Sequence, residues 1–261
     1  MSPGGGELLF SLSDTNKLTA LIREFLFKSR PSLPNGFRVR GHDVKRIETF
    51  SDGVFAFAVT LLIVSLEVPK TFEELLITMR GFVAFAICFT LLLMVWHEQN
   101  VFFRRYALDD RASIVLNAML LFIVLFYVYP LKFLFSLIFS NQIYGTGRNP
   151  FAITQHEVSK LMIIYGLGYV AIYSLFLLMY LHALRHRQML ELTALEIFDT
   201  KTKIYAQAIL ISVGVVSILL AMVLPSGSAG ISGMFYMAIG PAFWIFYSKR
   251  WPKRMRLWRK T

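Results

Sequence analysis

The sequence predicts an all-α polytopic membrane protein with six transmembrane helices. Its 261 residues are 56% hydrophobic and only 16% charged, whereas about a quarter of the residues of soluble proteins are charged. Several long stretches also lack charged residues altogether, and each is long enough to cross a bilayer. This composition excludes a soluble enzyme and a disordered chain. A disulfide scaffold is also excluded, because the single cysteine, Cys88, has no partner in the chain.

The uncharged stretches give the positions of the predicted spans. Four spans are expected at residues 50–68, 81–96, 112–131 and 161–184, and two more within residues 204–248. The last stretch is too long for one crossing at 1.5 Å per residue. Its segment Pro225-Ser-Gly-Ser-Ala-Gly230 therefore predicts a tight turn between the fifth and sixth helices.

Positive charge is distributed unevenly between the connections. Most of the 27 Lys and Arg residues precede the first span, follow the second or fourth, or lie after residue 248, while the alternate connections carry only Lys70 and Arg148. By the positive-inside rule both termini are cytoplasmic and the Gly145–Asn149 connection is external. The expected organisation is a cytoplasmic tail over residues 1–45, a six-helix transmembrane domain over 46–248 and a basic cytoplasmic tail over 249–261.

The two tails carry different patterns. Apolar residues recur at helical spacing over residues 18–26, which predicts an amphipathic helix on the inner leaflet or against the cytoplasmic ends of the spans. Basic residues alternate with Trp251 and Trp258 after the sixth span, and such a pattern can bind single-stranded nucleic acid. A basic stretch directly after a span more commonly fixes topology and binds anionic headgroups, so we expect anionic lipids and no nucleic acid as partners.

The sequence carries no recognisable catalytic motif. It lacks a Walker loop, HExxH, CxxC and any Ser/His/Asp order, so no enzymatic activity and no cofactor are expected. His182 and His186 have the i, i+4 spacing of metal ligands, but at the end of a span they are more typical of a wetted flank, and no metal site is expected. The external segment Tyr144-Gly-Thr-Gly147 is interpreted as a turn, because no pore helix precedes it.

The positions of the carboxylates bear on transport. Asp52 and Glu67 bracket the first span and Glu98 is expected to follow the second, so every carboxylate is expected at an edge or in a loop. Proton-coupled or sodium-coupled carriers usually place an ionisable group at bilayer depth. This counts against a proton-coupled carrier, whereas a carrier that uses hydroxyls and carbonyls stays open.

The first span carries a distinctive helical stripe. Its members combine a glycine, a hydroxyl and large apolar groups: Gly53, Phe57, Thr60, Leu61 and Val64. Such a stripe can line a pore. The alternative is close helix packing through small residues, with the Thr60 hydroxyl bonded to the carbonyl four residues earlier; Gly53, Ala56, Ala58 and Thr60 would then be the packing residues. Spacing alone favours packing.

A carboxylate and a hydroxyl at the start of this span change that balance. Ser51 and Asp52 would cost several kcal/mol in an apolar span unless partners satisfy them. Arg46, His97 and Asn117 are candidate partners from the same membrane face. We expect a polar network that ties the first helix to the second and third and that positions the helix without taking part in chemistry.

The first half of the sequence resembles a known family. Arg46-x-x-x-Phe50-Ser51-Asp52, followed by Gly-Val-Phe-Ala-x-Ala-x-Thr-Leu-Leu, is similar to the signature of the transmembrane protein 175 family, which comprises bacterial channels and a lysosomal potassium channel. Trp96-His97, and Asn117 with Pro130, also match over residues 46–131. The last three spans match only in number and length.

The resemblance implies a central pore lined by the first helix of each six-helix repeat. Carried over by position, the constriction is Phe57, with Thr60, Leu61 and Val64 lining the path beyond it. The family usually has Ile or Leu where this chain has Phe57. The matching positions outside the pore form the implied structural polar network: Arg46, Phe50, Ser51, Asp52, Trp96, His97 and Asn117.

The signature occurs once, so one chain supplies one repeat, and a single first helix cannot enclose a path. The resulting hypothesis is a homotetrameric, potassium-preferring cation channel in a prokaryotic plasma membrane. Two alternatives remain, a secondary carrier of a small solute or ion and a membrane anchor without transport activity.

Overall fold

The computed structural model describes residues 36–41, 44–64, 69–140, 143, 154–225 and 230–259. The chain divides into two compact units, Met1–Val39 and Arg40–Thr261. All the helices described below belong to the second unit. The expected amphipathic helix over residues 18–26, the Tyr144-Gly-Thr-Gly147 segment and the Gly145–Asn149 connection lie outside the described residues.

The described elements are all helices, which confirms the predicted all-α class. In chain order they are α2 (Arg46–Val64), α3 (Phe72–Arg80), α4 (Phe82–Tyr106), α5 (Arg111–Ile138), α7 (Gln155–Arg185), α8 (Ala194–Val223), α9 (Gly230–Met234), the 3-10 helix η2 (Phe235–Ala238) and α10 (Ile239–Trp258). The expected division of the uncharged stretch 204–248 is present, because α8 ends before Pro225 and α9 begins at Gly230.

Among the residues that the structure describes, five helical segments are long and apolar enough to cross a membrane. They are Phe72–Tyr106, Arg111–Ile138, His156–Arg185, Ala194–Val223 and Gly230–Trp258. The 19-residue helix α2 is not among these five. It carries Glu48 and Asp52 in its first turns, and its described part ends at Val64.

The helices extend beyond the uncharged stretches from which they were predicted. Helix α4 continues ten residues past Trp96, and α8 begins at Ala194 rather than at Ile204. The start of α8 is fixed by a capping box in which Thr193 accepts from the backbone of Glu196 and the Glu196 side chain accepts from the backbone of Thr193. Charged residues therefore indicate where a helix meets polar surroundings more reliably than they indicate where the helix starts.

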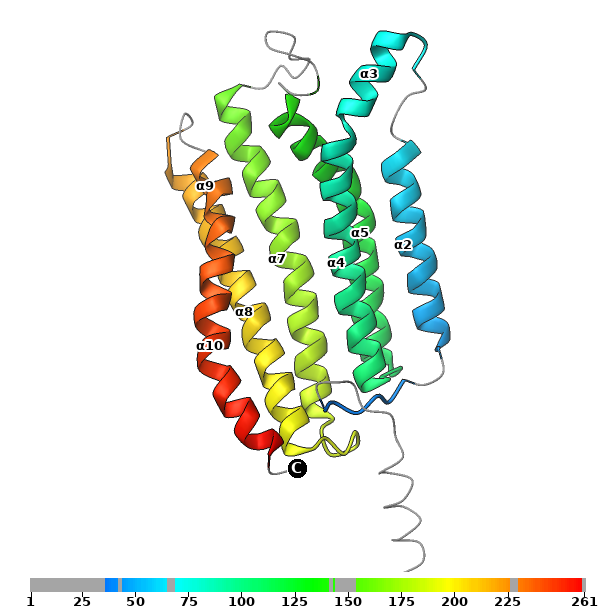
Figure 1. The fold of residues 1–261 in the computed structure, drawn as a ribbon, viewed down its shortest axis with the longest axis vertical. Coiled ribbons are helices and arrows are strands. Elements are labelled where there is room, and N and C mark those ends of the chain that lie inside the picture. The colour runs from blue at the N-terminus through cyan, green and yellow to red at the C-terminus, as the bar shows by residue number, and fades with distance from the viewer. Residues whose placement is uncertain are drawn as a thin grey trace, which may run out of the picture. The chain divides into compact units, whose positions relative to one another are not determined.

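The helices pack as two groups of three. Helix α2 packs against α4 and α5, while α8 packs against α7 and α10. The two groups meet mainly where α5 packs against α7. Figure 1 shows α7 near the middle of the bundle, with α2 and α10 at opposite edges. Helix α2 thus lies at the margin of its group and contacts other helices on one side.

The basic connections meet at one end of the bundle. Figure 1 places the start of α2, the α4–α5 turn, the α7–α8 loop and the end of α10 at the same end. These are the connections that carry most of the Lys and Arg residues. We refer to this end as the basic end.

Candidate functional site

Helix α2 has a packed face. Four side chains at helical spacing are almost completely buried against α4 and α5: Ser51, Phe55, Ala58 and Leu62. Three of these positions are apolar, and the fourth is a hydroxyl that donates to the carbonyl of Ile47 at 2.7 Å. This face therefore holds α2 against α4 and α5 through three buried apolar side chains and one buried hydroxyl.

The opposite face of α2 is open. Its exposed residues are Asp52, Gly53, Ala56, Phe57, Thr60 and Ile63. The Phe57 side chain is 56% exposed, and a Cβ added at Gly53 would meet no atom within 4 Å. The expectation that small residues serve close helix packing is therefore met within the chain only at Ala58. Gly53, Ala56 and Thr60 have no neighbouring helix in the described part of the protomer.

The residues expected to line a pore lie on or beside this open face. Phe57 and Thr60 are exposed and Leu61 is half-buried, while the side chain of Val64 lies outside the described residues. The Thr60 hydroxyl donates to the carbonyl of Phe57 at 2.7 Å, three residues earlier, rather than four residues earlier as expected. Because the hydroxyl uses its hydrogen in this bond, its acceptor lone pairs are left for another partner.

A buried polar network joins α2 to its two neighbours. The Asn117 side chain of α5 donates to the Ser51 hydroxyl at 2.8 Å and accepts from Gln99 Nε2 of α4 at 3.1 Å. All three side chains are 2% exposed or less. Because each polar group has a partner, the network fixes the rotation and height of α2 without leaving an unpaired group in an apolar core.

Asp52 has a separate partner, and two expected members are absent from the network. Trp96 Nε1 donates to Asp52 Oδ1 at 2.8 Å. Arg46 and His97 are exposed and make no hydrogen bond or ion pair with any described residue. Arg46 lies on the same helical stripe as Phe50 and Phe57, so it points to the open side of α2 rather than to Ser51.

Gln99 was not expected in the network, although its spacing gave a signal. It lies three residues after Trp96, and such residues share one helix face. A second polar cluster was also missed, because Glu98 was expected at the edge of its span and Lys203 in a connection. Both lie inside helices, and Lys203 Nζ is 2.7 Å from Glu98 Oε2.

The Glu98 cluster is more than an ion pair. The Tyr180 hydroxyl donates to Glu98 at 2.7 Å, and Gln207 Nε2 donates to it at 3.3 Å. The carboxylate therefore joins α4 to α7 and α8. Because Lys203 already neutralises its charge, the cluster is suited to holding helices together rather than to binding a cation.

The two histidines with metal-ligand spacing have other partners. His182 Nε2 lies 2.8 Å from Asp110 Oδ2, and His186 bonds to the carbonyl of His182. Within the described ranges, no group of three or more His, Cys, Asp or Glu side chains is arranged to hold a metal ion. Burial alone would raise the pKa of Asp110, but hydrogen bonds from Ser113 and His182 hold that pKa below its usual value.

Comparisons with known proteins identify the family of the chain. Residues 46–127 match the family model described as the endosomal/lysosomal potassium channel TMEM175. The chain is 40% identical to a potassium channel of Marivirga tractuosa over 85% of this chain and 93% of that protein. It is also 36% identical to a potassium channel of Chamaesiphon minutus, over 33% of this chain and 46% of that protein.

A solved structure has the same fold. The crystal structure of a threonine-to-alanine variant of the potassium channel MtTMEM175, in complex with a nanobody fusion protein, superposes with a TM-score of 0.75 at 39% identity. It covers 84% of this chain and all of that chain. The resemblance found in the sequence is thereby confirmed, and the homologues are channels, not enzymes. The chain is a multi-pass membrane protein that belongs to the TMEM175 potassium channel family.

Proposed function

We propose that four copies of this chain form a potassium-preferring channel whose pore is lined by the open face of α2. The observation that carries this proposal is the division of α2 into a buried face at Ser51, Phe55 and Ala58 and an open face at Gly53 and Thr60. Potassium permeation is supported by the channels to which the chain is related.

The composition of the open face supports a pore rather than a lipid surface. The exposed faces of α4 and α5 carry large apolar groups such as Met94, Phe122 and Phe126. The open face of α2 carries the large apolar side chains of Phe57 and Ile63, but beside them it has a glycine, an alanine, a hydroxyl and a carboxylate. A lipid-facing helix gains by covering its backbone with large apolar side chains, so this face fits a narrow passage better.

The proposed homotetramer is supported by the position of α2 at the margin of the chain. One α2 cannot enclose a path, and closed cyclic symmetry is the usual way in which identical subunits do so. Four copies of α2 would bring four Phe57 rings together as the constriction, with Thr60, Leu61 and Val64 lining the path beyond them. Arg46, Phe50 and His97, which lie on open surfaces of the protomer, would be available at the contacts between subunits.

The proposed selectivity mechanism uses dehydration. A ring of large apolar side chains excludes hydrated ions, so an ion sheds water to pass, and potassium holds its water less tightly than sodium. Each tenfold preference corresponds to about 1.4 kcal/mol, which a difference in partial dehydration can supply. The hydroxyl oxygen of each Thr60 would coordinate the ion and replace part of the water that the ion has lost.

The basic end sets the proposed orientation. We place it in the cytoplasm of a prokaryotic cell, with the channel in the plasma membrane and both termini inside. Lys249, Lys253 and Arg256 of α10 are exposed beside Trp251, so this segment suits anionic lipid headgroups. Reporter fusions at residue 261 and near residue 146 test the orientation, and external labelling of the C-terminus would refute it.

The distinguishing experiment is single-channel recording of purified protein in planar bilayers under potassium and sodium gradients. A potassium-preferring channel gives unitary currents whose reversal potential lies closer to the equilibrium potential of potassium than to that of sodium. A secondary carrier gives saturable flux without unitary steps, and an anchor gives neither. Native mass measurement in detergent should show four chains, and a conducting monomer would contradict the proposed assembly.

A further inference from the structure

The residues just before α2 are anchored to the neighbouring turn. The backbone N–H groups of Arg40 and Gly41 donate to the carbonyl of Arg104 at 3.1 and 3.2 Å. A Cβ at Gly41 would lie 3.1 Å from the carbonyl oxygen of Phe103, so glycine permits this close approach. The backbone that leads into α2 therefore lies directly on the end of α4.

Lys45, the residue that precedes α2, is anchored to the same turn. Its ammonium donates to the carbonyl of Ala107 at 2.6 Å and lies 2.9 Å from Asp109. Ala107 has a left-handed backbone with φ of 48°, and its N–H closes the end of α4 by donating to the carbonyl of Phe103, which leaves its own carbonyl to accept from Lys45. The start of α2 is thus held against the α4–α5 turn.

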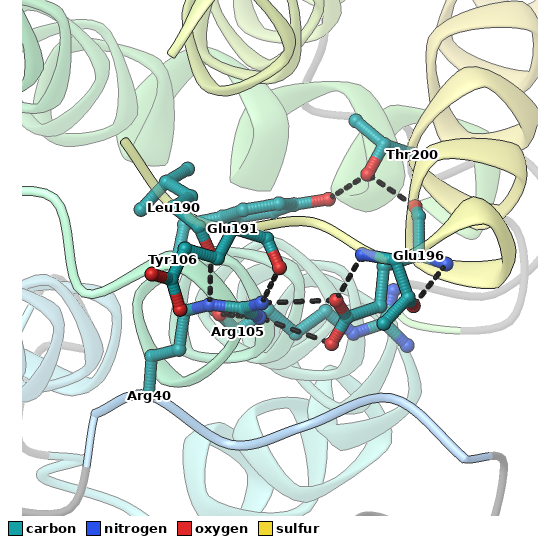
Figure 2. A network of polar contacts seen from close by, with 8 residues as sticks. Arg40, Arg105, Tyr106, Leu190, Glu191, Glu196 and Thr200 are labelled. Carbon is teal, nitrogen blue, oxygen red and sulfur yellow. Dashed lines mark hydrogen bonds and ion pairs between the residues drawn. The ribbon is translucent and has the colours of Figure 1, made fainter. Parts of the chain in front are cut away.

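Arg40 reaches further, into the second group of helices. Its Nη1 and Nη2 lie 3.1 and 2.9 Å from the two carboxylate oxygens of Glu196, and its Nε donates to the carbonyl of Leu190 at 3.0 Å. Nη2 also donates to the carbonyl of Glu191 at 3.5 Å. Figure 2 shows the guanidinium lying between the α7–α8 loop and the first turn of α8.

This pair is buried and rigidly held. The Glu196 side chain is fully buried and that of Arg40 is 9% exposed. Glu196 is also fixed by its capping box with Thr193, and its backbone carbonyl accepts from Thr200, whose hydroxyl pairs with Tyr106 of α4 at 2.7 Å. Burying two charges costs several kcal/mol, so such a pair is better explained by the position that it specifies than by added stability.

We propose that Arg40 is a positioning residue for α2, because its pair with Glu196 fixes the start of this helix to the α7–α8 loop and thereby sets how often the pore is open. This inference rests on the proposed function, since it requires α2 to line the pore. The pair connects the pore helix with the group of helices from which it is otherwise separated.

The test compares Arg40 variants with a matched control in the full-length channel. Arg40→Gln removes one charge, Arg40→Lys keeps the charge but loses the bidentate geometry, and Arg40→Gln with Glu196→Gln removes both charges. The control is Arg254→Gln, which breaks a similar buried bidentate pair with Asp199 that does not touch the residues before α2. Single-channel recording gives open probability, unitary conductance and the potassium-to-sodium permeability ratio.

We expect all three Arg40 variants to change open probability by about fivefold or more, with conductance and permeability ratio as in the wild type. Arg254→Gln should leave open probability unchanged. Open probabilities equal to the wild type in every assembled Arg40 variant would overturn the proposal. So would failure of all three variants to assemble while Arg254→Gln assembles, because the pair would then serve folding alone.

Failure of this proposal differs from failure of the proposed function. If α2 does not line the pore, Phe57→Ala and Thr60→Ala leave conductance and selectivity unchanged, whatever Arg40 does. If only the positioning role is wrong, those two variants change permeation and the Arg40 variants have normal open probability.

Discussion

The two groups of helices are stabilised in different ways. In the group of α2, α4 and α5, the interior contact at α2 is a neutral chain of Ser51, Asn117 and Gln99, and one whole face of α2 is open. In the group of α7, α8 and α10, α7 and α8 approach closely at a glycine, and α8 and α10 share the buried charge pair Asp199–Arg254. At Gly214 of α8, an added Cβ would lie 2.7 Å from Val170 of α7.

This difference indicates that the two groups of helices have different roles. The helices of the second group approach each other closely and share a buried ion pair, which is typical of a rigid scaffold. The first group contains α2, a helix that is held on one side only. A helix held on one side by neutral hydrogen bonds can be fixed in rotation and still be free to face a pore. Changes in the second group should therefore affect stability, and changes on α2 should affect permeation.

The largest expected effect is on the stability of the scaffold. Arg254→Gln leaves Asp199, which is 10% exposed, without its charge partner, and should lower the free energy of unfolding by about 3 kcal/mol. Thermal unfolding in detergent measures the loss. Unitary conductance should stay unchanged, and a conductance change without loss of stability would break the proposed division between the groups.

The next effect is on the neutral network. Asn117→Leu leaves the buried Gln99 amide without its partner, at a cost of about 1–3 kcal/mol, while the Ser51 hydroxyl loses one donor and still donates to the carbonyl of Ile47. We expect reduced yield of assembled channel. Asp52→Asn is the milder companion, since an amide can still accept from Trp96, and it should alter assembly or gating rather than selectivity. A change in selectivity alone would place Asp52 in the pore.

Phe57→Ala should act on conductance and not on folding. Phe57 is 56% exposed in the protomer, so its removal leaves no cavity inside the chain, and the widened constriction should raise unitary conductance severalfold. The matched control is Val59→Ala on the same helix, which lies beside the buried face. Wild-type conductance in Phe57→Ala, or a similar increase in the control, would mean that the constriction lies elsewhere.

Thr60→Ala should produce a smaller change, in selectivity. Loss of the hydroxyl removes a ligand that replaces water around potassium, and the potassium-to-sodium permeability ratio should fall by about threefold, which corresponds to less than 1 kcal/mol. Reversal potentials in bi-ionic solutions measure the ratio. Thr60→Ser keeps the hydroxyl and should retain selectivity, and equal ratios in Thr60→Ala and Thr60→Ser would argue against a ligand role.

The smallest expected effect is at the basic end. Asp110→Asn keeps an N-cap for α5 but removes the charge that faces His182. Because the folded-state pKa of Asp110 is lowered, its carboxylate stabilises the fold above its ordinary pKa, and this contribution is lost as the pH falls through the lowered value. The difference in melting temperature between wild type and variant should be small at pH 7, should begin to shrink as the pH falls below about 4, and should vanish once the pH is below the lowered pKa. A difference that persists there would assign it to the cap.

The sequence was sufficient for the class, the number of spans after residue 71 and the family. The hydrophobic stretches and the single signature predict these features because both depend on local pattern. Helix ends were predicted less well, since polar caps such as Thr193 extend helices beyond the apolar stretch. The buried pairs Arg40–Glu196 and Glu98–Lys203 join residues more than a hundred positions apart, and only tertiary packing brings them together.

The candidate site was predictable in part for the same reason. Helical spacing placed Gly53, Phe57 and Thr60 on one stripe, and the structure finds these three positions exposed. Spacing alone could not separate a pore from close packing, because it does not show where neighbouring helices lie. Arg46 was assigned to the network because it lies at the same membrane face as Ser51, although helical spacing places it on the stripe of Phe57.

Cysteine modification along α2 tests most directly whether its open face lines the pore. Single cysteines at Ala56 and Thr60 are compared with cysteines at Phe55 and Ala58, while native Cys88 is buried and should stay unmodified. A small, positively charged thiol reagent is applied to open channels during recording. The account predicts that modification at 56 and 60 blocks the potassium current, whereas 55 and 58 remain unaffected. Block at 55 and 58 with none at 56 and 60 would contradict it.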